Sequence, residues 1–194
     1  MEILLILLGL FAVIAFLVIV MYNRLVALRQ RRENAFADID VQLKLRADLV
    51  PNLVETVKGY ATHENEVLTQ VTEARAKAMV ASGTQERAAA EGMLGMALTN
   101  LMAVAESYPD LKANQNFQQL QAELSDIENK IAAARRFLNN TTMEYNTAIE
   151  QFPANMVAGA FSFHRSEFFD VGTQQRAELE KGVKVSFAKD DSGA

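Results

Sequence analysis

The chain has 194 residues and a formal net charge of −5, and it is 50% hydrophobic with nine glycines and three prolines. This composition argues against disorder and against a loop-rich all-β fold, and the length fits one ordinary domain beside an apolar segment. Because there is no cysteine, disulfides, cysteine-ligated metals and thiol nucleophiles are excluded. The mild negative charge argues against nucleic-acid binding.

The first segment of the chain predicts a transmembrane helix. No charged residue occurs from Ile3 to Met21, and about 19 residues in a helix span roughly 28 Å, close to the hydrocarbon thickness of a bilayer. A signal peptide usually has a basic start, a shorter apolar run and a small-residue cleavage site. This run ends instead in Tyr22-Asn23-Arg24, which is typical of an interface anchor. We therefore expect residues 1–23 to form an uncleaved, single-pass membrane anchor.

The residues after the span predict its orientation. Four arginines follow it closely: Arg24, Arg29, Arg31 and Arg32. The positive-inside rule places such a flank in the cytoplasm, with the N-terminus outside. The same arginines also fit a solvated helix face, in which case the domain would lie on the other side of the membrane.

Helical periodicity continues beyond the membrane segment. Apolar residues recur every three or four positions from Leu25 to Ala78, as on a helix face that packs against partner helices. Pro51 removes one backbone donor and clashes with the preceding turn, which predicts a kink or a short break over residues 48–52. We expect Asn52 to stabilise this kink, because its side-chain amide can bind backbone groups that a broken helix leaves free.

Two further helices are predicted in the second half of the chain. Residues 82–84 form a turn, and a helix from about Thr84 to Ser107 follows it, closed by Pro109. The cleanest amphipathic pattern comes next and predicts a helix of about 43 residues that ends at Pro153.

The stretch from Ala154 to about Phe169 predicts a fifth, shorter amphipathic helix that is rich in aromatic residues. Its helical stripe contains Val157, Phe161, His164 and Phe168, and two more phenylalanines lie outside the stripe. The aromatic residues either cap the bundle as core or, if exposed, insert at the membrane interface or dock a partner. The candidate interaction surface consists of Phe161, Phe163, His164, Arg165, Phe168 and Phe169.

Together these elements predict an all-α protein, with a transmembrane helix followed by a long antiparallel bundle of four to five helices over residues 24–170. Residues 171–194 read as an extended polar tail, in which residues 183–187 alternate like a short strand. The same apolar stripes allow an intermolecular coiled coil through residues 25–47, so a homo-oligomer stays open.

Two long runs of residues resemble a known family. The first is YNRLVALRQRRENAFADIDVQLKLRADLVPNLVETVKGYATHENEVLTQVTEARA, and the second is YPDLKANQNFQQLQAELSDIENKIAAARRF followed by EYNTAIEQFP and VKVSF. In this order and spacing they resemble the LemA family of bacterial membrane proteins over nearly the whole chain. The resemblance implies an N-terminal anchor in the bacterial inner (cell) membrane and a helical bundle, but no reaction. Where the family pattern reads R-x-Y-N-x-x-V-x-x-Y-N, Leu138 stands in place of the first tyrosine, which puts any role of that hydroxyl in doubt.

Polar residues within these runs have two readings. They either form buried pairs that fix the register of the helices or face a partner, and long bundles favour the first reading. These residues are Asp38, Asp40, Arg46, Asn52, Glu128, Arg135, Asn139, Tyr145 and Asn146.

The sequence offers no catalytic centre. His63-Glu64 lacks the second histidine of a zinc helix, and no di-iron Glu-x-x-His pair, phosphate-binding loop or nucleophile elbow occurs. We therefore expect no enzyme activity, cofactor or metal. The expected function is a membrane-anchored scaffold or adaptor that presents a surface to other membrane-associated proteins. The alternative is a self-assembling oligomer that organises or shapes the lipid bilayer.

Overall fold

The computed structural model describes residues 1–170, and the predicted tail with its strand-like segment lies outside the described residues. Within residues 1–170 the chain forms helices and no strand, which confirms the all-α class. The helices are α1 (Glu2–Lys58), α2 (Asn65–Val80), α3 (Thr84–Glu106), α4 (Pro109–Lys112), α5 (Gln115–Glu150) and α6 (Ala154–Ala160).

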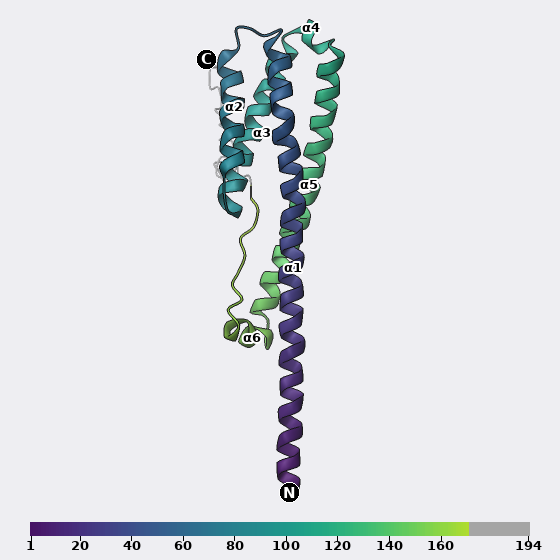
Figure 1. Ribbon diagram of the computed structural model, residues 1–194, viewed down its shortest axis with the longest axis vertical. Helices are drawn as coiled ribbons and strands as arrows, with labels where there is room; N and C mark the ends of the chain where they lie inside the picture. The colour runs from purple at the N-terminus through teal and green to yellow at the C-terminus, as the bar shows by residue number, and fades with distance from the viewer. Residues whose placement is uncertain (171–194) are drawn as a thin grey trace, which may run out of the picture.

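Helix α1 forms the spine of the molecule. Its 57 residues extend over roughly 85 Å, from the free N-terminal end to the far end of the bundle (Figure 1). Its most apolar 18-residue window is long and apolar enough to cross a membrane and is not buried by any other part of the described chain. Helix α3 passes the same test of length and composition, but 44% of its window is buried inside the bundle.

The other helices pack along the half of α1 that lies beyond the apolar segment. Helix α5 runs antiparallel to α1, and the α2–α3 hairpin covers the part of this pair farthest from the N-terminus (Figure 1). The largest apolar cluster lies there, where Leu53, Leu94 and Leu101 are fully buried. Nearer the N-terminus the hairpin is absent, and residues 163–170 cover α1 and α5 instead.

Of the kink or short break predicted at residues 48–52, the break is wrong, because α1 continues through Pro51 and the chain reverses at residues 59–64 instead. In an unbroken helix, Pro51 leaves the carbonyl of Ala47 without its usual backbone donor. The Nε of Arg75 on α2 donates to that carbonyl at 2.7 Å. Asn52 is exposed, so a neighbouring helix rather than the adjacent amide binds the group that Pro51 leaves free.

Helix α5 is shorter than predicted, with 36 residues instead of about 43. The chain after Pro109 first forms the single turn α4 and then starts again at Gln115. Asn114 defines this start, because its side-chain oxygen accepts a hydrogen bond from the backbone N–H of Phe117 at 3.1 Å, as an N-cap does. The apolar periodicity does not reveal the boundary between α4 and α5, because Leu111 in α4 and Phe117 in α5 are both buried.

The predicted fifth helix is confirmed only as far as Ala160, where α6 ends. Ser162 adopts a positive φ of 55°, and the N–H of Phe163 donates to the carbonyl of Ala158 at 2.9 Å. This is the hydrogen bond that closes a helix when a residue in the left-handed region follows it. Residues 163–170 are then free of helix and run back along α5; we call them the strap.

Two asparagines of α5 hold the strap through paired hydrogen bonds. Asn146 donates to the carbonyl of Ser166 and accepts from its N–H, each at 2.9 Å. Asn139 makes the same pair with Phe169, at 3.1 and 2.8 Å. Seven residues of helix cover roughly 10.5 Å and three extended residues roughly 10 Å, so the two spacings match. The asparagine side chains thus bind the strap as a neighbouring β-strand would.

We expect Asn139→Ala to release the end of the strap, because both hydrogen bonds to Phe169 are lost. At ~0.5–1.5 kcal/mol for each bond, the variant should lose about 1–3 kcal/mol of stability. Hydrogen exchange of the Phe169 amide should speed up accordingly. Asn140→Ala, at the exposed neighbouring position, is the matched control and should leave exchange unchanged. Equal protection in both variants would contradict this role of Asn139.

Candidate functional site

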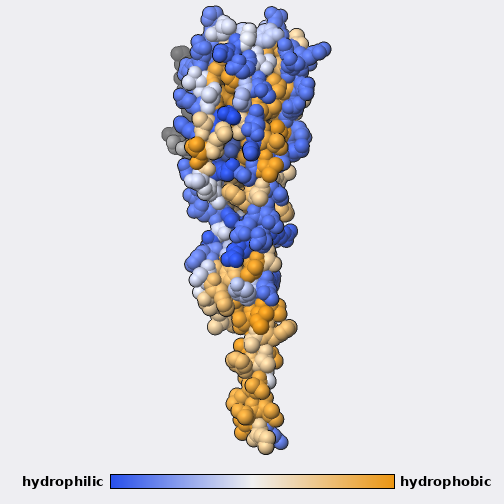
Figure 2. All heavy atoms as spheres, in the orientation of Figure 1, coloured by the Kyte–Doolittle hydropathy of each residue, from blue (hydrophilic) through white to orange (hydrophobic). Residues whose placement is uncertain are grey.

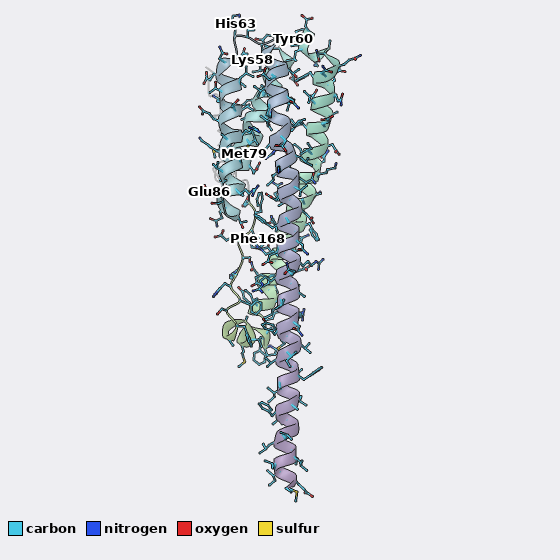
Figure 3. The ribbon with its side chains drawn as sticks, viewed as in Figure 1. Lys58, Tyr60, His63, Met79, Glu86 and Phe168 are labelled. Atoms are coloured by element: carbon cyan, nitrogen blue, oxygen red, sulfur yellow. The ribbon has the colours of Figure 1, made fainter. Side chains whose placement is uncertain are left out.

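The six aromatic and basic residues of the predicted interaction surface do not form one surface. Phe163 and Phe169 are buried, with 7% and 1% exposure, whereas Phe161 and Phe168 are 53% and 45% exposed. The buried pair are the two that lie outside the predicted helical stripe, because the strap is extended at these positions. His164 and Arg165 are exposed, and Phe168 lies on the strap beneath the α2–α3 hairpin (Figure 3).

Phe161 and Phe163 belong instead to an aromatic cluster at the membrane-proximal end of the bundle. The ring of Tyr22 on α1 lies 4.9 Å from that of Phe161 and 5.7 Å from that of Phe163, measured between centroids. The guanidinium of Arg29 lies over the Phe163 ring at 5.2 Å, a cation–π geometry. The cluster therefore joins the exit of the apolar segment to the chain that follows α6.

The polar residues predicted to fix register have different positions. Asp38 and Asn52 are exposed, and Asn146 holds the strap. Glu128 pairs with a buried arginine, and Arg135 lines the groove described below.

Arg46 is the centre of a buried network that joins three helices. Its side chain is 4% exposed, and its Nη2 donates to the Oε2 of Glu91 on α3 at 2.5 Å and to the backbone carbonyl of Glu91 at 3.1 Å. Its Nη1 donates to the Oε1 of Glu128 on α5 at 2.7 Å. A buried guanidinium needs such partners because desolvation of an unpaired charge is costly. Arg46 therefore fixes the positions of α3 and α5 relative to α1.

Glu91 was not predicted from the sequence. Burial raises the pKa of its carboxyl group above the ordinary value, and the hydrogen bond and charge of Arg46 act in the opposite direction. A signal was present, because Glu91 stands between Ala88 and Leu94 at helical spacing, on the face of α3 that is otherwise apolar. An acidic residue on such a face predicts a buried cationic partner.

A groove between α3 and α5 lies beside this network. Its volume is about 500 Å³. The backbones of the two helices stay apart, whereas the backbone of α1 lies close to those of α2 and α5; side chains of α3 and α5 such as Leu98 and Leu124 still share the largest apolar cluster. Gly92 and Gly95 place no side chain in the groove. The remaining lining is apolar or charged: Leu43, Arg46, Glu91, Met96, Leu98, Met102, Leu124, Glu128, Ile131, Arg135 and Phe169, with Thr99 as the one hydroxyl.

Within residues 1–170, no group of three or more His, Asp or Glu side chains is arranged to hold a metal ion. His63 lies in the loop at the far end of the bundle, close to Lys58 and Tyr60 and away from the groove (Figure 3).

An apolar N-terminal helix that continues as the spine of an all-helical bundle defines a membrane-associated helical protein. The family model described as "LemA family" matches residues 35–187. The chain therefore belongs to the LemA family, which confirms the resemblance of its two long runs.

The relatives that the chain matches are distant in sequence. The chain is 24% identical to magnetosome protein MamQ 2 of Paramagnetospirillum magneticum, over 81% of this chain and 68% of that protein. It is 25% identical to magnetosome protein MamQ of Magnetospirillum gryphiswaldense, over 76% and 64%. It is 26% identical to protein LemA of Metamycoplasma hominis, over 81% and 73%.

We expect Arg46→Met to destabilise the bundle by about 3–5 kcal/mol near neutral pH, because Glu91 is left as an unpaired buried carboxylate. The loss should shrink as the pH falls to about 5, since the folded state then binds a proton at Glu91 more readily than the unfolded state does. Urea unfolding of the detergent-solubilised full chain, followed by circular dichroism, measures both effects.

Two further variants test the cause. Arg46→Met combined with Glu91→Gln removes the unpaired charge and should recover part of the loss. Lys44→Met removes an exposed cation of the same helix and should change stability by less than about 0.5 kcal/mol. A loss for Arg46→Met that does not depend on pH would contradict the assigned network.

Proposed function

We propose that this chain is a non-catalytic, membrane-anchored scaffold or adaptor, whose groove between α3 and α5 binds an apolar helix of a membrane-associated partner protein. The observation that carries the proposal is the groove itself. The bundle is closed where α1 meets α2 and α5 and where α2 meets α3, but it is open between α3 and α5.

The chemistry of the groove fits a helical peptide. Amphipathic helices bind in apolar grooves through side chains spaced three and four residues apart. Met96 and Met102 line one wall, and methionine side chains adapt their shape to different partners. Glu128 is 41% exposed while it binds Arg46, so its second oxygen remains available for a polar contact at the rim.

The anchor would hold the groove at a fixed distance from the membrane surface. Because α1 is one continuous helix, Arg46 lies 25 residues beyond Met21, which corresponds to roughly 38 Å. The basic flank favours a cytoplasmic domain with the N-terminus outside. Partners would then be cytoplasmic proteins or cytoplasmic segments of membrane proteins.

A photo-crosslinking experiment tests the groove in the full chain. Replacing Met96 with p-benzoylphenylalanine and irradiating the expressing cells should give a discrete adduct that contains a peptide of another protein. Met93 is the matched control, because it lies on the same helix with similar exposure, 40% against 47%, but does not line the groove. It should give no such adduct.

The identity of the adduct decides between the readings. A partner peptide of amphipathic helical sequence supports the proposal. An adduct to a second copy of this chain supports the self-assembling oligomer instead. An adduct to residues 171–194 of the same chain, or equal adducts at Met93 and Met96, overturns the proposal.

The proposed orientation has its own test, which uses the lack of native cysteine. We expect Asn116→Cys, at an exposed position on α5, to resist a membrane-impermeant maleimide in spheroplasts and to react after lysis. Glu2→Cys, at the other end of the span, should react before lysis. The reverse pattern would place the bundle outside the cytoplasm.

A further inference from the structure

Helix α6 and its flanks expose an unusual concentration of apolar side chains. Phe152, Met156 and Phe161 are 80%, 67% and 53% exposed. Figure 2 shows apolar surface at this level that is continuous with the apolar N-terminal segment and separated from the rest of the bundle by a hydrophilic zone. Large exposed apolar patches mark surfaces that contact another apolar phase.

Packing against α1 fixes the position of α6 along the membrane normal. Leu25, 1% exposed, shares one apolar cluster with Val157, Ala158 and Phe163, and Val18 and Met21 from the end of the apolar segment pack against the same cluster. The Tyr22–Phe161 ring contact at 4.9 Å sets the exposed aromatic at the level of the residue that follows the span. Helix α6 therefore lies where a bilayer that surrounds residues 3–21 has its surface.

The distribution of charge agrees with this position. No acidic, lysine or arginine side chain occurs between Glu150 and Arg165, the stretch that contains α6. Glu150 and Arg165 form an ion pair at 3.1 Å, so the charged residues at the two ends of the uncharged stretch contact each other. Ion pairs and arginines suit the headgroup region, whereas an uncharged stretch with phenylalanine and methionine suits the boundary below it.

We propose that α6 is a second membrane contact, which lies in the plane of the interface and inserts Phe152, Met156 and Phe161 into the lipid. The occupant of this surface is lipid rather than a partner protein, because α6 packs through Val157 and Ala158 on the end of the span, and its exposed apolar surface continues that of the span (Figure 2). The chain thus binds the bilayer at two points, the transmembrane helix and α6.

The chain contains no tryptophan, so single tryptophans report the depth of each site. We use the full chain in phosphatidylcholine vesicles with and without bromine on the acyl chains, which quenches nearby indoles. Phe161→Trp and Phe152→Trp should each lose about half of their emission, because an interfacial helix inserts its apolar face ~5–10 Å below the headgroups.

Two references calibrate the result. Ile14→Trp, in the exposed apolar segment, should be quenched and reports incorporation of the anchor. Phe137→Trp replaces an aromatic residue of 43% exposure on α5, more than one helical turn above α6, and should keep its emission.

The outcomes separate clearly. Quenching at Ile14→Trp without quenching at Phe152→Trp and Phe161→Trp overturns the proposal, and the apolar patch is then left for a protein partner. Quenching at Phe137→Trp as well shows that the bundle lies flat on the bilayer, which also overturns it. Neither result depends on whether the α3–α5 groove binds a partner, because the vesicles contain this chain alone.

Discussion

The continuity of α1 is the constraint on which the rest of the molecule depends. One helix of 57 residues provides the apolar segment, the face on which α6 packs and the spine to which α2 and α5 attach. A proline in its second half would normally interrupt such a helix. Here the carbonyl that Pro51 leaves free is bound by Arg75 of α2, so the hairpin that packs on α1 also keeps it intact.

The groove and the buried charges are two results of one arrangement. Because α3 and α5 stand apart, the side of the bundle between them is open, and Arg46 bridges the gap with one nitrogen on Glu91 and the other on Glu128. A hydrophobic pair at these positions would pack the helices together and close the groove. The ion-pair network instead holds two helices at a distance, and each terminal nitrogen of Arg46 pairs with a carboxylate of one of them.

Sequence reasoning was sound where one helix face repeats over many turns and failed where a single residue ends a helix. The apolar segment, α3 and the body of α5 follow from periodicity. The break predicted at Pro51 was wrong, because the hydrogen bond that replaces the missing backbone donor comes from Arg75, a residue distant in sequence. The strap was predicted to be helical because its aromatic residues recur at helical spacing. No local sequence pattern predicts the positive φ of Ser162, which ends the helix. Asn139 and Asn146 were noticed as polar residues, but their pairing with an extended chain became visible only in three dimensions.

The unbroken α1 also sets the distance between the apolar segment and the groove. If the groove binds a partner as proposed, a site roughly 38 Å above the membrane is out of reach for any lipid-tethered or membrane-spanning neighbour whose docking segment begins directly at the bilayer. Such a neighbour needs a connecting linker of at least about 12 residues if fully extended, or roughly 50 residues if the linker is a flexible coil whose average span grows with the square root of its length. Under the proposed function, the length of one helix would thus select among neighbouring proteins by the length of their linkers, independently of the side chains of the groove.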